Sequence, residues 1–209
     1  MKNKLRIIGG DWRSRQLSFA DAPGLRPTPA RVRETLFNWL QYEIAGKQCL
    51  DLYAGSGALG FEAASRGAKL VVQVETNAQA CRCLKENALA LSAADRVKVV
   101  QSDVSHYLSG AAQAFDVVFL DPPFGMGLAV QTCMQLEANG WLAKYSKIYV
   151  ETERHFDFSR GASMPRALSG GRAMQIGNAA DLSGMPENWR LLKSKTAGEV
   201  AYHLFERSE

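Results

Sequence analysis

The chain has 209 residues, of which 46% are hydrophobic, and its formal net charge at neutral pH is +4. This length predicts one globular domain with a small appendage, and no apolar run is long enough to cross a bilayer. The first 16 residues are basic but lack the apolar core of a signal peptide, and the four cysteines lack the spacing of metal ligands. We therefore expect a cytoplasmic protein with reduced cysteines and no bound metal.

The N-terminal segment predicts a small hairpin followed by a helix. Residues 5–8 and 17–19 are short strand candidates, each followed by a turn that contains glycine. Thr28 and Pro29 are typical of an N-cap and the first residue of a helix. We expect the hairpin to form a basic arm over residues 1–27.

Basic side chains are concentrated at this end of the chain. Residues 1–33 carry eight Lys or Arg side chains against Asp11 and Asp21, a net charge of +6, so the remaining residues sum to −2. A basic arm on a nearly neutral body suggests a polyanionic partner such as nucleic acid. A solvated basic tail without a partner explains the charge equally well.

From Gln48 onward, apolar strand candidates alternate with helical stretches, which predicts an α/β domain over residues 28–209. Buried strands of this kind argue for a mostly parallel sheet covered by helices on both faces. The short turn at Ala197-Gly198 forces the last two strands to pair antiparallel. Residues 154–186 break the pattern and are expected to be a surface excursion, either a tolerated insertion or a substrate-binding flap. The expected strands are 48–53, 69–75, 97–101, 115–121, 147–151, 189–195 and 199–206, and the expected helices are 58–66, 77–91, 103–109 and 128–139.

A glycine-rich loop follows the first strand of this sheet. Three glycines between residues 55 and 60 match the pattern G-x-G-x-x-G, and Glu75 ends the next strand, as in dinucleotide-binding proteins. Asp51 favours a different cofactor, because its carboxylate would repel a pyrophosphate but could hold the ammonium of a methionine moiety. Asp103, after the third strand, could accept a hydrogen bond from an adenine amine or simply cap the next helix. The loop alone leaves a nicotinamide dinucleotide and S-adenosylmethionine open.

The turn Asp121-Pro122-Pro123-Phe124, which follows an apolar strand, is the most informative functional signal. An aromatic exocyclic amine is a poor nucleophile because its lone pair is delocalised into the ring. Hydrogen bonds from the amine to the Asp121 carboxylate and the Pro122 carbonyl would localise that lone pair and aim it at an activated methyl group. Phe124 would stack on the base, and the prolines would restrict the turn. The turn predicts methylation of a nucleobase amine by S-adenosylmethionine, against the simpler interpretation of a common Asp-Pro turn.

These motifs resemble the bacterial 16S ribosomal RNA guanine-N2 methyltransferases, a family of class I S-adenosylmethionine enzymes. The likeness covers nearly the whole chain, and its most specific block is Arg31-Val32-Arg33-Glu34-Thr35-Leu36-Phe37-Asn38. It implies a Rossmann-like α/β fold with a seven-stranded, mostly parallel sheet, an antiparallel last strand and a small N-terminal hairpin extension. The other matching parts are residues 6–10, 24–28, 50–60, 121–124 and 197–202.

The resemblance also implies the members of each site. The cofactor site would contain Asp51, Tyr53, Ala54, Gly55, Ser56, Gly57, Glu75 and Asp103. The guanine would be received and methylated at Asp121, Pro122, Pro123 and Phe124. RNA would be held by Arg6, Arg13, Arg15, Arg26, Arg31 and Arg33, and by Trp12, which lies among these basic residues. The implied partner is 16S ribosomal RNA within the small ribosomal subunit or its assembly intermediate, and we expect a monomer that does not bind membranes.

Three other functions stay open from the residues alone. A DNA adenine-N6 methyltransferase can use the same kind of turn, although no separate target-recognition domain is evident. A nicotinamide-dependent oxidoreductase would use the glycine loop but leaves the Asp-Pro-Pro-Phe turn unexplained. A non-catalytic RNA-binding module explains the charge asymmetry but leaves the cofactor and amine sites without a purpose.

Overall fold

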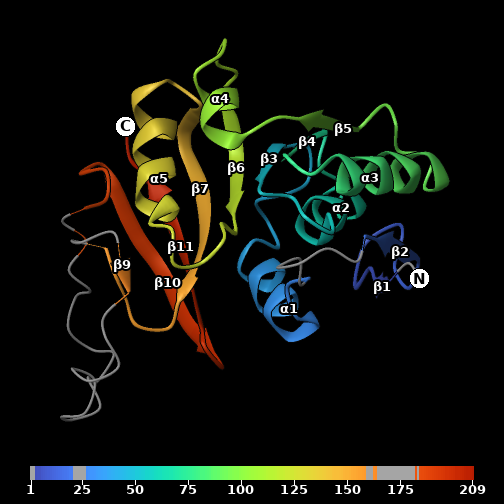
Figure 1. The fold of residues 1–209 in the computed structure, drawn as a ribbon, viewed down its shortest axis with the longest axis horizontal. Coiled ribbons are helices and arrows are strands. Elements are labelled where there is room, and N and C mark those ends of the chain that lie inside the picture. Colours follow the sequence, from blue (N-terminus) through green and yellow to red (C-terminus); the bar gives the residue numbers. More distant parts are fainter. Residues whose placement is uncertain (1–2, 21–26, 159–161, 164–181, 183) are drawn as a thin grey trace.

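The computed structural model describes residues 3–20, 27–158, 162–163, 182 and 184–209 (Figure 1). Its helices are α1 (Ala30–Trp39), α2 (Ala58–Ser65), α3 (Ala78–Ala90), α4 (Val104–Leu108) and α5 (Leu128–Ala138). Its strands are β1 (Asn3–Arg6), β2 (Gln16–Phe19), β3 (Gln48–Leu52), β4 (Leu70–Glu75), β5 (Val97–Gln101), β6 (Phe115–Leu120), β7 (Leu142–Glu153), β8 (Phe156–Asp157), β9 (Ala162–Ser163), β10 (Trp189–Ala197) and β11 (Val200–Arg207). Within these described ranges, no helix is long and apolar enough to cross a membrane.

The central sheet has seven strands in the order β10-β11-β7-β6-β3-β4-β5. Strands β7, β6, β3, β4 and β5 are parallel, whereas β11 pairs antiparallel with both β7 and β10. Only two residues separate β10 from β11, which is too short for a parallel crossover. The predicted sheet, with its antiparallel last strand, is therefore confirmed.

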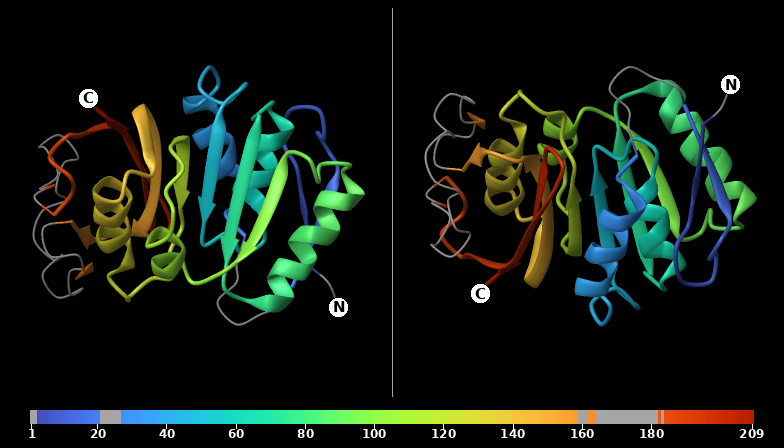
Figure 2. Two further views of the ribbon diagram at one scale, coloured as in Figure 1. Left: turned by 90° about the horizontal axis from the view of Figure 1, so that it is seen from above. Right: turned by 90° about the horizontal axis from the view of Figure 1, so that it is seen from below.

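Helices cover both faces of this sheet, and each face has its own hydrophobic cluster (Figure 2). Residues of α1, α2 and α3 belong to one cluster, and residues of α4 and α5 belong to the other. Successive side chains of β6 alternate between them, with Val117 and Phe119 in the first and Val118 and Leu120 in the second. Burial on both faces explains why the strand sequences are apolar without a break.

The N-terminal hairpin packs against the helices of the first face. Strands β1 and β2 pair antiparallel, and their apolar side chains Leu5 and Leu17 join the same cluster as α1 to α3. The backbone amides of Ile8 and Gly9 each donate to the Glu62 carboxylate of α2 at 2.8 Å. The hairpin thus shares a core with the sheet domain, and a buried acid fixes its position.

Two local expectations are wrong. Helix α1 begins at Ala30 rather than Pro29, and the Thr28 side chain does not cap it, because the Thr28 hydroxyl bonds a carboxylate elsewhere. The expected surface excursion is partly core in the residues that are described: Phe158 and Met185 are buried in the second cluster. Apolar side chains that follow no helical or strand period can still pack at a sheet edge. The lack of periodicity in residues 154–186 therefore did not mean that all their described side chains are exposed.

Candidate functional site

The glycine loop after β3 is shaped by its backbone. Gly57 has a φ of +75°, and a Cβ there would approach Leu84 Cδ2 to 2.5 Å and the Phe61 ring to 2.8 Å. Only glycine combines that backbone conformation with so close an approach. Ala54 and Ser56 are buried, and the Tyr53 hydroxyl lies 2.8 Å from the Thr132 hydroxyl of α5. The loop between β3 and α2 is therefore held in one conformation.

Asp51 organises this loop from within. Its Oδ2 accepts hydrogen bonds from the Gly60 amide at 2.9 Å and from Gln73 Nε2 at 3.1 Å. Burial raises the pKa of Asp51 to about 7, although both hydrogen bonds oppose the rise. Asp51 Oδ1 takes part in neither bond, and its expected contact with a methionine ammonium stays a prediction.

Glu75 and Asp103 lie at the ends of the next two strands and bind backbone amides. Glu75 accepts from the Gly55 amide at 2.8 Å and from the Asn77 amide at 2.7 Å, which places its carboxylate against the glycine loop. Asp103 accepts from the His106 amide at 3.1 Å and so caps α4. Asp103 therefore forms the helix cap that was one of its two expected roles. The ribose contact of Glu75 and the adenine contact of Asp103 stay predictions.

The Asp-Pro-Pro-Phe turn follows β6, the strand that neighbours β3. Pro122 is buried, whereas Pro123 and Phe124 are exposed, Phe124 at 42%. The loop is closed behind them by a hydrogen bond from the Gly125 amide to the Glu153 carboxylate of β7. Burial raises the pKa of Asp121 to about 6. The turn presents an aromatic ring to solvent beside a carboxylate that is half-buried.

Residues that the sequence did not single out complete the surroundings of Asp121. The Thr28 hydroxyl donates to Asp121 Oδ2 at 3.4 Å, and Thr28 also lies near the buried carboxylate of Glu151 on β7. The Tyr149 hydroxyl donates to Glu151 Oε1 at 2.8 Å. The sequence feature that could have indicated a role for Glu151 is its position as an acid within the strand β7. A buried charge without a partner is costly, so such an acid needs a reason. For Thr28 there was no such feature, because the sequence around it has the pattern of an ordinary helix N-cap.

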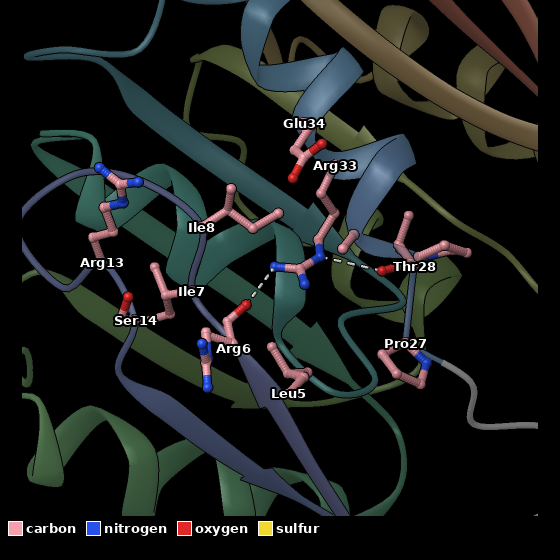
Figure 3. A pocket seen from close by; sticks show the side chains of 12 residues that line it. Leu5, Arg6, Ile7, Ile8, Arg13, Ser14, Pro27, Thr28, Arg33 and Glu34 are labelled. Atoms are coloured by element: carbon pink, nitrogen blue, oxygen red, sulfur yellow. Dashed lines mark hydrogen bonds between the residues drawn. The ribbon is translucent and has the colours of Figure 1, made fainter.

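Exposed arginines surround a cavity of about 470 Å³ between the hairpin and the start of α1 (Figure 3). Arg6 and Arg13 line it together with Thr28. Arg15 and Arg31 are also exposed, and Arg15 donates to the carbonyl of Ala90 at 3.1 Å. Arg26, the other expected RNA contact of this region, lies outside the described residues.

Two expected RNA contacts, Arg33 and Trp12, are buried and engaged within the protein, and their contact with RNA stays a prediction. Arg33 is 4% exposed, and it donates to the carbonyls of Thr28 and Arg6, at 3.1 Å each, and lies 3.5 Å from Glu62 (Figure 3). Trp12 is 8% exposed and packs under Arg96, whose guanidinium carbon lies 4.9 Å from the ring centroid. Both side chains stabilise the docked hairpin, and Arg33 also lines the cavity beside Arg6 and Arg13.

Comparison with known proteins identifies the family. A family model described as Conserved hypothetical protein 95 matches residues 5–178. Ribosomal RNA small subunit methyltransferase D of Escherichia coli strain K12 is 43% identical over 204 residues, which cover 98% of this chain and 90% of the relative. The Haemophilus influenzae protein of the same name is 41% identical and is covered to 95%. The chain belongs to the ribosomal RNA small subunit methyltransferase D family.

Solved structures agree with this family in fold. An Escherichia coli protein that is 41% identical superposes with a TM-score of 0.78 and coverage of 99% of both chains. A Thermus thermophilus 16S rRNA N2 G1207 methyltransferase, solved with AdoMet and guanosine, gives a TM-score of 0.67 at 22% identity and is covered to 50%. This second likeness concerns the fold alone. The family and the class I methyltransferase fold predicted from the sequence are both confirmed.

Proposed function

We propose that this chain transfers a methyl group from S-adenosylmethionine to the exocyclic N2 amine of a guanine in 16S ribosomal RNA. The observation that carries the proposal is the half-buried Asp121 carboxylate beside the exposed Phe124 ring, in a member of a small-subunit ribosomal RNA methyltransferase family. Family membership also displaces the nicotinamide-dependent and DNA-directed alternatives that the residues alone left open.

The residues around the glycine loop fit S-adenosylmethionine. Glu75 offers a carboxylate to ribose hydroxyls at the edge of the loop, and Asp103 offers one to an adenine amine at the end of the next strand. Both accept backbone amides already, and a carboxylate has lone pairs for more than one donor. When bound, the cofactor supplies a methyl group on a positively charged sulfur. No group of three or more His, Cys, Asp or Glu that could hold a metal ion occurs among the described residues.

The Asp-Pro-Pro-Phe turn supports a role in holding the target amine. An ionised Asp121 accepts a hydrogen bond from the amine, which localises the nitrogen lone pair for attack on the methyl carbon. The amine nitrogen would gain the methyl group as the methyl–sulfur bond breaks and its electron pair stays on sulfur, and it would lose one proton, for which Asp121 is a suitable acceptor. Phe124 is exposed and able to stack on a guanine that has been unstacked from the RNA.

The arginines near Thr28 support RNA binding on the same side of the molecule. Arg6 and Arg13 line a cavity that Thr28 also lines, and Thr28 contacts Asp121. Phosphates held by these guanidinium groups would place the target nucleotide close to the turn. We also propose that the enzyme acts in the cytoplasm as a monomer on the small subunit or its assembly intermediate; light scattering of the purified protein tests its oligomeric state.

The function is tested by methylation of small subunits from a strain that lacks its own enzyme of this family. With tritiated cofactor, the wild-type protein should yield N2-methylguanosine in 16S ribosomal RNA. Asp121→Ala should lower kcat by about 100- to 1,000-fold, the effect of removing one fixed electrostatic partner of a transition state. Its affinity for S-adenosylhomocysteine, measured by calorimetry, should be unchanged. Full activity of Asp121→Ala, or label only in DNA, would refute the proposal.

A further inference from the structure

A cluster of buried acids and hydroxyls surrounds the inner side of Asp121. Strands β6 and β7 are parallel neighbours in which Leu120 pairs with Val150, so Asp121 and Glu151 follow at adjacent strand positions. Glu151 is 3% exposed, and the Thr28 hydroxyl, which donates to Asp121 Oδ2 at 3.4 Å, lies near it. Thr28 itself is buried. Two acids and one hydroxyl therefore lie together on the inner side of the turn.

The groups that face this pair from the surrounding elements supply no positive charge. They are Asp51 of β3, Tyr149 of β7 and Tyr202 of β11. Among the described residues, none of the ion pairs includes Asp121 or Glu151. A buried carboxylate beside a half-buried one, with no cation between them, disfavours double ionisation, so one of them keeps its proton.

We propose that Asp121 and Glu151 hold a single proton at neutral pH, on Glu151, and that Thr28 is the positioning residue that maintains this arrangement. Asp121 then meets the target amine as an anion while its Oδ2 is held by the Thr28 hydroxyl. The inference rests on the role proposed for Asp121 in methyl transfer. It adds two residues to that site, neither of which needs to touch the substrate.

The titration behaviour of the two acids agrees with this assignment. Burial raises the pKa of Asp121 to about 6, and the Thr28 hydrogen bond opposes the rise. Burial, and then the charge of Asp121, raises the pKa of Glu151 to about 8. Between these values Asp121 is ionised and Glu151 is protonated. A protonated Glu151 does not repel Asp121, and it leaves the Thr28 hydroxyl free to donate to Asp121.

Thr28 is kept in place by a chain of contacts that begins at the N-terminal hairpin. Arg33 donates from Nε to the Thr28 carbonyl at 3.1 Å and from a terminal nitrogen to the Arg6 carbonyl (Figure 3). Glu62, which accepts the hairpin amides, also pairs with Arg33. The docked hairpin thus fixes the segment that carries Thr28, and through it the orientation of Asp121.

The experiment compares Thr28→Val, which removes the hydroxyl, with Thr28→Ser, which keeps it. Losing the hydroxyl raises the pKa of Asp121, so the acid limb of kcat should move about one pH unit upward in Thr28→Val, and kcat below pH 6 should fall about tenfold. Thr28→Ser should restore the wild-type profile. Thr35→Val on α1 is the matched control, because the Thr35 hydroxyl donates to the Arg31 carbonyl and should leave the profile unchanged. A Thr28→Val profile like that of the wild type, or a Thr28→Ser variant as impaired as Thr28→Val, would overturn the proposal.

A second measurement does not depend on activity. Carbon-13 NMR of the assigned Asp121 and Glu151 carboxyl groups should show titrations near pH 6 and near pH 8 in the wild type, and Glu151→Gln should remove the second. Both acids titrating near pH 4 would overturn the shared proton. If the wild type methylates no guanine in small subunits, the proposed function fails, while the carboxyl titrations still decide whether the pair shares a proton.

Discussion

Asp51, the second-last residue of β3, and Asp121, directly after β6, are both acids near the end of an apolar parallel strand, but they differ in their hydrogen-bond partners. Strands β3 and β6 are paired in register, with Leu52 opposite Leu120. Asp51 is buried and accepts from a backbone amide and a side-chain amide of its own chain. Asp121 is half-buried, and the hydrogen bond found for it in the described residues comes from the Thr28 hydroxyl. Asp51 thus organises the loop through Oδ2 and keeps Oδ1 for its expected ligand, whereas Asp121 has most of its acceptor capacity free.

The largest expected effect on stability comes from Asp51→Ala. It leaves the Gly60 amide and Gln73 Nε2 without their buried acceptor, which should lower the free energy of unfolding by about 3 kcal/mol in urea denaturation. Asp121→Ala should lower it by less than about 1 kcal/mol, because a single long hydrogen bond is lost. Equal destabilisation by the two variants would mean that both strand ends are structural.

The pH dependence of stability sharpens the same contrast. Burial raises the pKa of Asp51 to about 7 in the folded protein, whereas an unfolded aspartate titrates near pH 4, roughly. The folded state binds the Asp51 proton more tightly than the unfolded state does. The stabilisation that this proton binding provides is complete below about pH 4 and is lost as the pH rises to about 7. Asp51→Asn cannot ionise, so its stability relative to the wild type should increase between about pH 4 and about pH 7. Parallel stability curves for the two proteins would contradict this sign.

Among the carboxylates that contact the glycine loop, Glu75 has the clearest expected role in cofactor binding. Glu75→Gln removes a charged acceptor, worth about 1.5–3 kcal/mol per hydrogen bond, so affinity for S-adenosylhomocysteine should fall about 10- to 100-fold. Calorimetric titration measures this directly, with Asp121→Ala as the control that keeps full affinity. Unchanged affinity in Glu75→Gln would assign Glu75 to the loop backbone alone, to which it is already hydrogen-bonded.

The sequence predicts the strands and the loop that form the site better than it predicts the side-chain contacts within the site. The parallel strands and the glycine loop are local patterns, so the order of carboxylates at the strand ends follows from them directly. Arg31 and Arg33 look alike in the sequence, but Glu62 draws Arg33 into the interior from 29 positions away. Thr28 has the local signature of a helix cap and instead reaches Asp121, 93 positions later. Such partners are set by tertiary packing, which no local pattern encodes.

A smaller effect on cofactor affinity is expected at Asp103, which caps a helix and is also an expected ligand contact. Asp103→Ala removes the hydrogen bond that caps α4, which should lower the free energy of unfolding by about 1 kcal/mol.

Asp103→Asn is the discriminating control, because asparagine caps helices as well as aspartate does. If Asp103 also accepts a hydrogen bond from the adenine amine, Asp103→Asn should keep the stability of the wild type but bind S-adenosylhomocysteine about fivefold more weakly, since a neutral acceptor replaces a charged one. If Asp103 is only a cap, Asp103→Ala will lose stability while both variants keep full affinity. In that case Asp103, like Asp51, belongs to the acids that organise the fold.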